Sequence, residues 1–180
     1  MQTVRLTILA LFLSCGALLL VPAGSQAVEL GAFYGKFQGM GVAEDAESIY
    51  FETTVRELTL EIRPAGNGFE IAWSTAFNKG GDPNAPKRKE RSASVSFIPS
   101  GKPGVYVSNN TSPFEGPVWW AAFKGQTLFT YMMQVDDEGR WLVQQYERTL
   151  TGSGMELVFS RHRDGEDLRT VKGRLNRLSY

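Results

Sequence analysis

The sequence predicts an all-β protein, an antiparallel meander of about eight to ten strands that closes into a barrel. Apolar and polar residues alternate in many short segments, a pattern typical of strands with one buried face. Glycine, proline, asparagine and aspartate cluster between those segments, as turns require. The late connections are short and sequential, and closing such a meander removes its edges, so a barrel is favoured. A two-sheet β-sandwich is the alternative.

Residues 1–27 are predicted to be a cleaved secretory signal peptide. Arg5 supplies a positive charge, residues 6–21 supply an apolar run, and Ser25 and Ala27 are the small residues that cleavage requires. The apolar run is about 16 residues long, which is shorter than the roughly 20 residues of a membrane-spanning helix. We therefore expect an exported protein, periplasmic or secreted, with no transmembrane span after the signal is removed.

Residues 28–180 are long enough to form a single β-barrel domain with a full core. The one cysteine, Cys15, belongs to the predicted signal, so the domain has no disulfide, thiol nucleophile or cysteine-ligated metal. The chain carries 19 basic and 19 acidic residues. This balance argues against general electrostatic binding to nucleic acid.

The N-terminal half contains the first strands of the predicted meander. Segments 57–63 and 69–74 alternate apolar with polar residues, and the turn sequence at 64–68 predicts that they form a hairpin. Residues 78–91 have no periodicity and predict a long polar loop. Further strands are predicted at 33–41, 93–97, 105–107 and 118–123, with a short helical turn within 43–51.

The C-terminal half has the clearest pattern, because four strands follow one another with only tight turns between them. Short connections of this kind suit an up-and-down order rather than crossings between sheets. The four strands are predicted at 127–135, 140–150, 155–159 and 168–178. The expected apolar face of the first of them consists of Phe129, Tyr131, Met133 and Val135.

Gly35 and Phe37 stand on the predicted first strand, and Arg174 and Arg177 stand on the last. This layout resembles the calycin group of barrels, which includes the lipocalins. Lipocalins have a Gly-x-Trp motif on the first strand, and a basic residue near the last strand packs over its aromatic ring. The resemblance implies that Phe37 replaces the tryptophan and that Arg174 or Arg177 covers it. The sequence is also similar to uncharacterised exported bacterial proteins, which implies no activity; the similar stretches are 33–37, 145–151 and 154–157.

The sequence contains no recognisable catalytic constellation. His162 is the single histidine, and a general base would also need an orienting carboxylate and a nucleophile. One histidine without cysteine makes a zinc site unexpected, and the acidic turn at 136–139 lacks the alternating ligands of a calcium loop. We therefore expect no catalytic residue, no metal and no cofactor. Whether the protein is an enzyme is left open, with a hydrolase that uses scattered carboxylates such as Glu147 as the third hypothesis.

Aromatic residues carry the leading functional hypothesis. An antiparallel barrel can enclose an apolar cavity, so we expect an exported, non-enzymatic barrel that binds a small apolar or amphipathic ligand. The same side chains could instead fill a narrow barrel completely, and the sequence leaves both packings open. The expected ligand-binding residues are Phe69, Trp73, Phe129, Tyr131, Trp141 and Phe159.

An adjacent pair of tryptophans supports an alternative hypothesis, a cell-envelope protein-protein interaction module with a filled barrel. Trp119 and Trp120 follow the predicted loop at 109–117. Successive strand residues point to opposite faces, so at least one of the two rings must face away from the interior. Exposed aromatic side chains often mark protein contacts, and these two are the predicted partner-binding residues.

Overall fold

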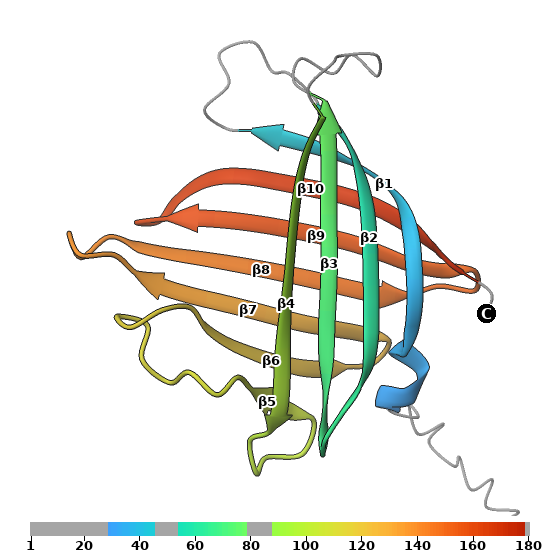
Figure 1. The fold of residues 1–180 in the computed structure, drawn as a ribbon, viewed down its shortest axis with the longest axis horizontal. Helices are drawn as coiled ribbons and strands as arrows, with labels where there is room; N and C mark the ends of the chain where they lie inside the picture. The colour runs from blue at the N-terminus through green and yellow to red at the C-terminus, as the bar shows by residue number, and fades with distance from the viewer. Residues whose placement is uncertain (1–28, 46–53, 79–87, 179–180) are drawn as a thin grey trace, which may run out of the picture.

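The computed structural model describes residues 29–45, 54–78 and 88–178. The described residues form ten antiparallel strands in one closed barrel, in which each strand pairs with the next and β1 pairs with β10 (Figure 1). The predicted barrel is therefore confirmed over the sandwich. The predicted signal peptide lies outside the described residues, as does most of the helical turn expected within 43–51.

The strands follow the alternating segments of the sequence closely. One 3-10 turn, η1 (Leu30–Phe33), leads into the first strand. The predicted loop at 78–91 is shorter than expected, because strand pairing resumes at Arg88 opposite Asn78. The strands are β1 (Gly35–Asp45), β2 (Thr54–Ala65), β3 (Gly68–Asn78), β4 (Arg88–Pro99), β5 (Val105–Val107), β6 (Val118–Lys124), β7 (Thr127–Val135), β8 (Trp141–Leu150), β9 (Gly154–Arg163) and β10 (Glu166–Arg177).

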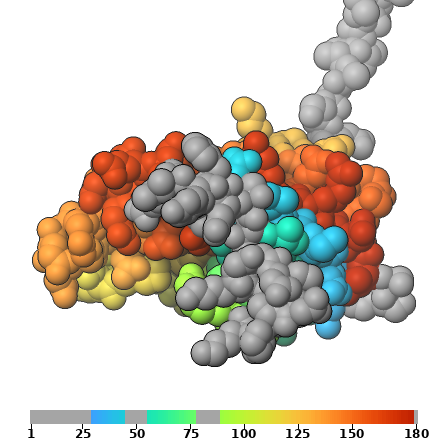
Figure 2. Space-filling model, turned by 90° about the horizontal axis from the view of Figure 1, so that it is seen from above, coloured from blue at the N-terminus to red at the C-terminus, as the bar shows by residue number. Residues whose placement is uncertain are grey.

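The barrel is flattened into two crossing layers. In Figure 1, β2, β3 and β4 run nearly vertically across the front, and β7 to β10 run nearly horizontally behind them. Seen from above, the cyan first strand lies against the red last strand, the contact that closes the barrel (Figure 2). The backbones approach closely there, because a Cβ at Gly39 would lie 1.9 Å from the carbonyl oxygen of Arg174.

Phenylalanine side chains fill one end of the barrel, which we call the phenylalanine end. The Phe69 ring stacks on Phe97 with centroids 4.9 Å apart and meets Tyr106 edge-on at 5.0 Å. The 3-10 turn adds Phe33, whose ring lies 5.3 Å from that of Phe123. Aromatic rings packed edge-on and offset in this way form a dense core. The largest fully buried side chains of this end are Phe33, Phe37, Ile62, Phe69, Ile71, Phe97, Leu128, Met155 and Leu175.

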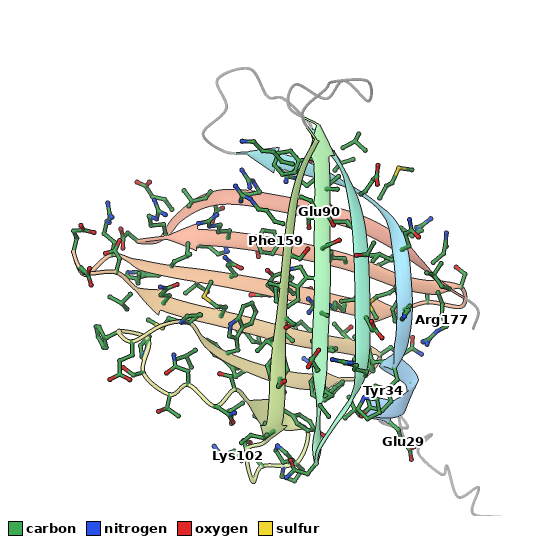
Figure 3. The ribbon with its side chains drawn as sticks, in the orientation of Figure 1. Glu29, Tyr34, Glu90, Lys102, Phe159 and Arg177 are labelled. Atoms are coloured by element: carbon green, nitrogen blue, oxygen red, sulfur yellow. The ribbon has the colours of Figure 1, made fainter. Side chains whose placement is uncertain are left out.

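The contact implied by the calycin resemblance is present, and Arg177 supplies it. Its guanidinium lies over the buried Phe37 ring, 4.5 Å from the centroid. The same group donates hydrogen bonds to the carbonyl oxygens of Tyr34 and Ala32, which ties the last strand to η1 (Figure 3). Arg174 points outward instead and pairs with Glu156 at 2.9 Å.

The inward face of β7 is opposite to the expected one. Leu128, Thr130 and Met132 are buried, and the intervening Phe129 and Tyr131 lie on the other side of the strand. Both sides of this strand carry apolar residues, so alternation alone does not identify the inner side. The inner side includes the hydroxyl of Thr130, which is tolerated because it has a buried hydrogen-bond partner, described below.

Candidate functional site

A cavity of about 320 Å³ lies inside the other end of the barrel. We call this the arginine end, after Arg56, Arg91, Arg161 and Arg169, which all line the cavity. The volume is at the lower end of the roughly 300–1,000 Å³ that small-molecule sites occupy. Leucine, methionine and valine side chains complete the apolar lining, namely Leu58, Met132, Leu157 and Val171.

Four aromatic side chains form the walls of this cavity, each from a different strand. Trp73 of β3 lies 5.6 Å from Trp119 of β6 and 5.7 Å from Tyr146 of β8, centroid to centroid. Tyr146 also lies 4.7 Å from Phe159 of β9. The rings meet because strand alternation points each of them into the barrel at about the same depth. They form an apolar enclosure with flat surfaces suited to packing against an aromatic or aliphatic body.

Hydrogen bonds fix the positions of two of these walls. The backbone N–H of Trp119 donates to the Ser108 hydroxyl at 3.0 Å, which anchors the start of β6. The Tyr146 hydroxyl donates to the side-chain oxygen of Gln144 at 2.9 Å. Burial raises the pKa of Tyr146 to about 12, so this hydroxyl stays protonated and keeps donating at neutral pH.

Arginine side chains concentrate positive charge around the cavity. Burial lowers the pKa of the half-buried Arg161 guanidinium. The positive charges of Arg163, Arg169 and Arg91 lower that pKa further. The Nε atom of Arg161 is buried, and no hydrogen-bond partner for it occurs in the described ranges. None of the described residues that line the cavity is acidic.

A fifth arginine lies deeper in the barrel, next to the cavity walls. Arg148 is 2% exposed; its Nη1 donates to the Thr130 hydroxyl at 2.6 Å, and its guanidinium lies 4.6 Å from the centre of the Tyr146 ring. Burial lowers its pKa to about 10, so the group is still charged at neutral pH. A buried guanidinium held by one neutral hydroxyl and one aromatic face is costly to accommodate.

The predicted ligand-binding residues separate into four groups. Trp73 and Phe159 line the cavity, whereas Phe69 is fully buried in the core of the phenylalanine end. Phe129 and Tyr131 stack on each other with centroids 6.4 Å apart, on the side of β7 away from the cavity. Trp141 begins β8 and is 36% exposed.

The adjacent tryptophans also separate, as strand alternation requires. Trp119 lines the cavity, and Trp120 stacks on Tyr131 with centroids 5.2 Å apart. Trp119 was predicted to bind a partner, and it lines the cavity instead. Tyr131 was predicted to bind the ligand, and it lies on the outer face beside Trp120. Sequence reasoning missed Tyr146 and the cavity arginines, because isolated polar residues in a strand do not reveal which face they occupy.

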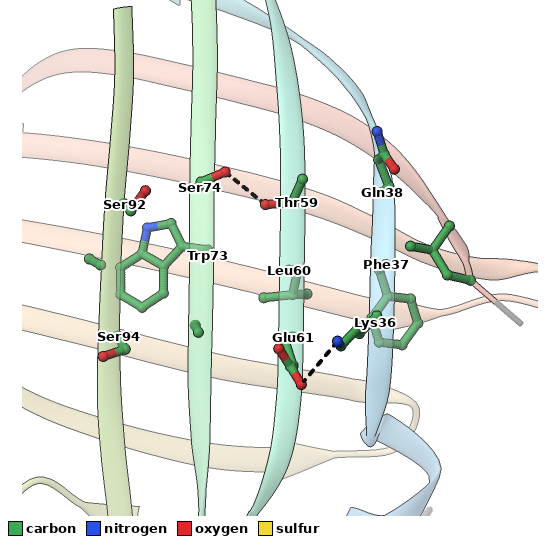
Figure 4. Close-up of a pocket in the computed structure, with 13 residues that line it drawn as sticks. Lys36, Phe37, Gln38, Thr59, Leu60, Glu61, Trp73, Ser74, Ser92 and Ser94 are labelled. Atoms are coloured by element: carbon green, nitrogen blue, oxygen red, sulfur yellow. Dashed lines mark hydrogen bonds and ion pairs between the residues drawn. The ribbon is translucent and has the colours of Figure 1, made fainter. Parts of the chain in front are cut away.

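A second hollow lies on the outer face of β1 to β4 and is shown in Figure 4. Its volume, about 620 Å³, exceeds that of the interior cavity, but it is a shallow trough on the surface of the sheet. Its polar groups are satisfied locally, since the Thr59 and Ser74 hydroxyls hydrogen-bond at 2.7 Å and Lys36 lies 3.9 Å from Glu61. The interior cavity is therefore the stronger site, because aromatic and aliphatic side chains from several strands enclose it.

The remaining polar candidates are parts of hairpins. His162 Nδ1 lies 2.6 Å from a carboxylate oxygen of Asp167 across the β9–β10 hairpin. In the turn between β7 and β8, Asp136 accepts hydrogen bonds from the backbone of Glu138 and Arg140 and from the Arg140 side chain. Hydrogen bonding to Arg140 lowers the pKa of Asp136 against the opposing effect of desolvation. No cluster of three metal-binding side chains occurs in the described ranges.

The comparisons with known proteins concern the fold. No family model and no curated protein matches the sequence. A solved structure of a DUF3598-family protein of unknown function from Nostoc punctiforme is similar over 84% of this chain, with 12% identity and a TM-score of 0.57. This chain covers 50% of that protein. An S-type phycobiliprotein lyase from Guillardia theta aligns over 82% of this chain and 89% of its own, with 8% identity and a TM-score of 0.34.

These findings show the fold alone. The described residues form a closed antiparallel barrel, and Arg177 covers the Phe37 ring in it, which is the contact that the calycin resemblance implies. The DUF3598-family structure supports this fold and, at its low identity, nothing finer. Among the helices of the described residues, none has the length and apolarity needed to span a membrane.

Proposed function

We propose that this protein binds a small apolar or amphipathic molecule inside the arginine end of its barrel. The observation that carries the proposal is the contrast in packing between the two ends. Rings fill the phenylalanine end completely, but Trp73, Trp119, Tyr146 and Phe159 surround a cavity of about 320 Å³. Well-packed interiors contain few voids larger than a water molecule, so a cavity of this size is a feature that function explains.

Export to the periplasm or the cell exterior is part of the same proposal, resting on the sequence of residues 1–27. Binding in an enclosed cavity requires no catalytic group, so the proposed role is carriage or sequestration. Mass determination of the protein isolated from its host tests the proposed export. Cleavage after Ala27 is expected, and a mass that includes residues 1–27 would contradict export by a cleaved signal.

The adjacent tryptophans provide a matched pair for testing ligand binding. Trp119 lines the cavity and Trp120 lies on the opposite face of the same strand, so each variant removes one indole from one face. Native mass spectrometry of the protein from its host should show an added mass that disappears on denaturation. We expect Trp119→Ala to lose that mass, and Trp120→Ala to keep it.

Calorimetry with neutral naphthaleneethanol provides a second readout that does not depend on the natural ligand. The expected result is binding to the wild type and to Trp120→Ala, with about fivefold weaker binding to Trp119→Ala, since a stacking contact is worth about 1 kcal/mol. Absence of both the added mass and naphthaleneethanol binding in the wild type would overturn the proposal.

A second candidate function is docking of a protein partner on the outer aromatic surface formed by Trp120, Phe129 and Tyr131. The specific observation is that these three rings stack in a continuous row, with Trp120 on Tyr131 and Tyr131 on Phe129. Aromatic rows on a sheet surface are a common element of interfaces. A partner that is retained by Trp119→Ala and lost by Trp120→Ala would favour this candidate over the cavity.

A further inference from the structure

We propose that the ligand carries an oxygen acceptor at its inner end, such as a carbonyl or hydroxyl oxygen, and that this oxygen accepts a hydrogen bond from Arg148 at the floor of the cavity. This inference rests on the proposed function and specifies the chemistry and the orientation of the ligand. It follows from a small space beside Arg148, from the donors of this side chain, and from its position on β8.

A second, smaller space adjoins the cavity inside the barrel, and we call it the inner space. Its volume is about 30 Å³, and Arg148 forms part of its lining. Roughly 10–15 Å³ is enough to admit one water-sized group, so the inner space fits a single oxygen atom but no further ring. Leu58, Trp73, Thr75 and Leu157 line both the inner space and the cavity. A ligand in the cavity can therefore extend one small polar group between these side chains.

Arg148 supplies hydrogen-bond donors to the inner space. It is 2% exposed, and Thr130 is its one hydrogen-bond partner within the described ranges, at 2.6 Å from Nη1. A guanidinium carries several N–H groups in a planar fork, so one hydrogen bond leaves donors for another acceptor. A ligand oxygen beside Arg148 would accept a charge-assisted hydrogen bond, which is stronger than one between neutral groups. This bond would also offset part of the cost of burying the charge.

The order of side chains along β8 places Arg148 at the floor of the cavity. Alternation points Gln144, Tyr146 and Arg148 into the barrel, and the first two line the cavity. Leu150 follows on the same face and packs against the core of the phenylalanine end. The Arg148 guanidinium lies 4.6 Å from the centre of the Tyr146 ring, on the way to that core. The ligand oxygen would therefore point toward the phenylalanine end, with the apolar body among the aromatic walls.

The type of residue at position 148 also favours a role in binding. An apolar side chain of similar volume would pack there without the cost of burying a charge. Departures from the local rules of packing are expected at functional sites, and a hydrogen bond to the ligand supplies a reason for this one.

The test compares two neutral probes that share one ring system and nearly one shape. Acetonaphthone carries a carbonyl oxygen, and isopropenylnaphthalene carries a methylene group in its place. Calorimetric competition against naphthaleneethanol measures the affinity of the full chain for each probe. We expect the ketone to bind at least tenfold more tightly, as a hydrogen bond to a charged group gives. Both probes are uncharged, so this preference should change little as salt is added.

Matched arginine variants locate the oxygen within the cavity. Arg148→Met should bind the two probes about equally, whereas Arg161→Met, which removes an arginine of the cavity lining, should keep the preference of the wild type. The inference is wrong if the wild type shows no preference for the ketone, if Arg148→Met keeps the preference, or if Arg161→Met loses it. The proposed function stands in each of these cases, provided that the wild type binds naphthaleneethanol or carries an added mass.

A wild type that binds neither probe nor naphthaleneethanol, and that carries no added mass, would instead overturn the proposed function. If Arg148→Met does not fold, a crystal structure of the wild type with acetonaphthone decides the question. A carbonyl oxygen within hydrogen-bonding distance of the Arg148 guanidinium supports the inference, and a carbonyl oxygen anywhere else contradicts it.

Discussion

The two ends of the barrel are built from the same strands by the same alternation, yet one end is solid and the other is hollow. At the phenylalanine end, Phe69 contacts three other rings with centroids 4.9 to 6.0 Å apart, and it is 0% exposed. Among the described residues that line the cavity of the arginine end, tryptophan, tyrosine and arginine side chains join a single phenylalanine, Phe159, and the space between them stays open.

The difference teaches that size and charge, rather than apolar pattern, decide where a barrel leaves space. Phenylalanine and leucine can interdigitate until no void is left, because they have no polar atom to satisfy. Guanidinium groups repel one another and require solvent or a partner, so they prevent the walls from collapsing onto each other. One end therefore contributes stability, and the other is available for binding.

The largest expected effect is a loss of stability when a ring of the phenylalanine end is removed. Phe69→Ala should lower the free energy of unfolding by about 3–5 kcal/mol, because it leaves a cavity among packed rings. Trp73→Ala should cost clearly less, although it removes a larger side chain, because one side of Trp73 already faces empty space. Denaturant unfolding of both variants measures the difference. Equal losses would contradict the contrast between the two ends.

The next effect concerns the charge beneath the cavity. Thr130→Val should destabilise the protein by about 1–3 kcal/mol, because it removes the hydroxyl that accepts a hydrogen bond from the buried Arg148 guanidinium. Arg148→Met, which replaces the charge with an apolar chain, should be neutral or stabilising. Combining the two should then make Thr130→Val nearly harmless. A large loss from Arg148→Met alone would show that this charge stabilises the fold.

A smaller effect is expected where the last strand meets the first. Arg177→Gln should cost about 1–2 kcal/mol, because it removes the cation above Phe37 and weakens the hydrogen bonds to the carbonyls of η1. Arg174→Gln is the control, since its pair with Glu156 is exposed and should change stability little. Thermal unfolding distinguishes them, and equal midpoints would refute the role assigned to Arg177.

The smallest expected effect concerns stability at alkaline pH, where the contributions of Tyr146 and Arg148 are expected to cancel. The pKa of Tyr146 is raised from 10.0 to about 12, so the stability it contributes is present below pH 10 and is lost as the pH rises toward 12. Burial lowers the pKa of Arg148 from its ordinary value to about 10, so the destabilisation caused by this buried charge is relieved as the pH rises above 10. The two contributions oppose each other, and the wild type should change little between pH 10 and 12.

Variants uncover the two opposing contributions. Arg148→Met should lose stability as the pH rises from 10 to 12, and adding Tyr146→Phe should remove that loss. Denaturant midpoints measured across this range provide the comparison. A wild type that loses as much stability as Arg148→Met would show that the two groups do not compensate each other.

Much of the fold could be predicted from the sequence, because alternation and turn residues are local signals. The strand at 127–135 was placed with its observed bounds, and Arg177 was one of two residues expected over Phe37. The prediction of which face of that strand points inward is wrong. Phe129 and Tyr131 are about as apolar as Leu128 and Met132, so alternation fits either face. Contacts between strands distinguish the two faces, such as the stacking of Trp120 on Tyr131 on the outer side.

The site was less predictable than the fold. Trp73 and Phe159 could be placed in the interior from their own strands, but Tyr146 and Arg161 could not. Arg161 stands in a run of charged and polar residues, Arg161 to Asp164, that resembles the start of a turn. Its position inside the barrel depends on the register between β8 and β9, which pairs it with Gln144. The arginines of the cavity are far apart in the sequence, so their proximity can be recognised only once the pairing of the strands is known.

A crystal structure of the full chain grown with naphthaleneethanol tests the central claim, ligand binding inside the arginine end, most directly. We predict that the naphthalene ring lies between Trp73, Trp119 and Phe159. A ligand bound only on the outer face, beside Trp120 or in the trough of β1 to β4, would contradict it.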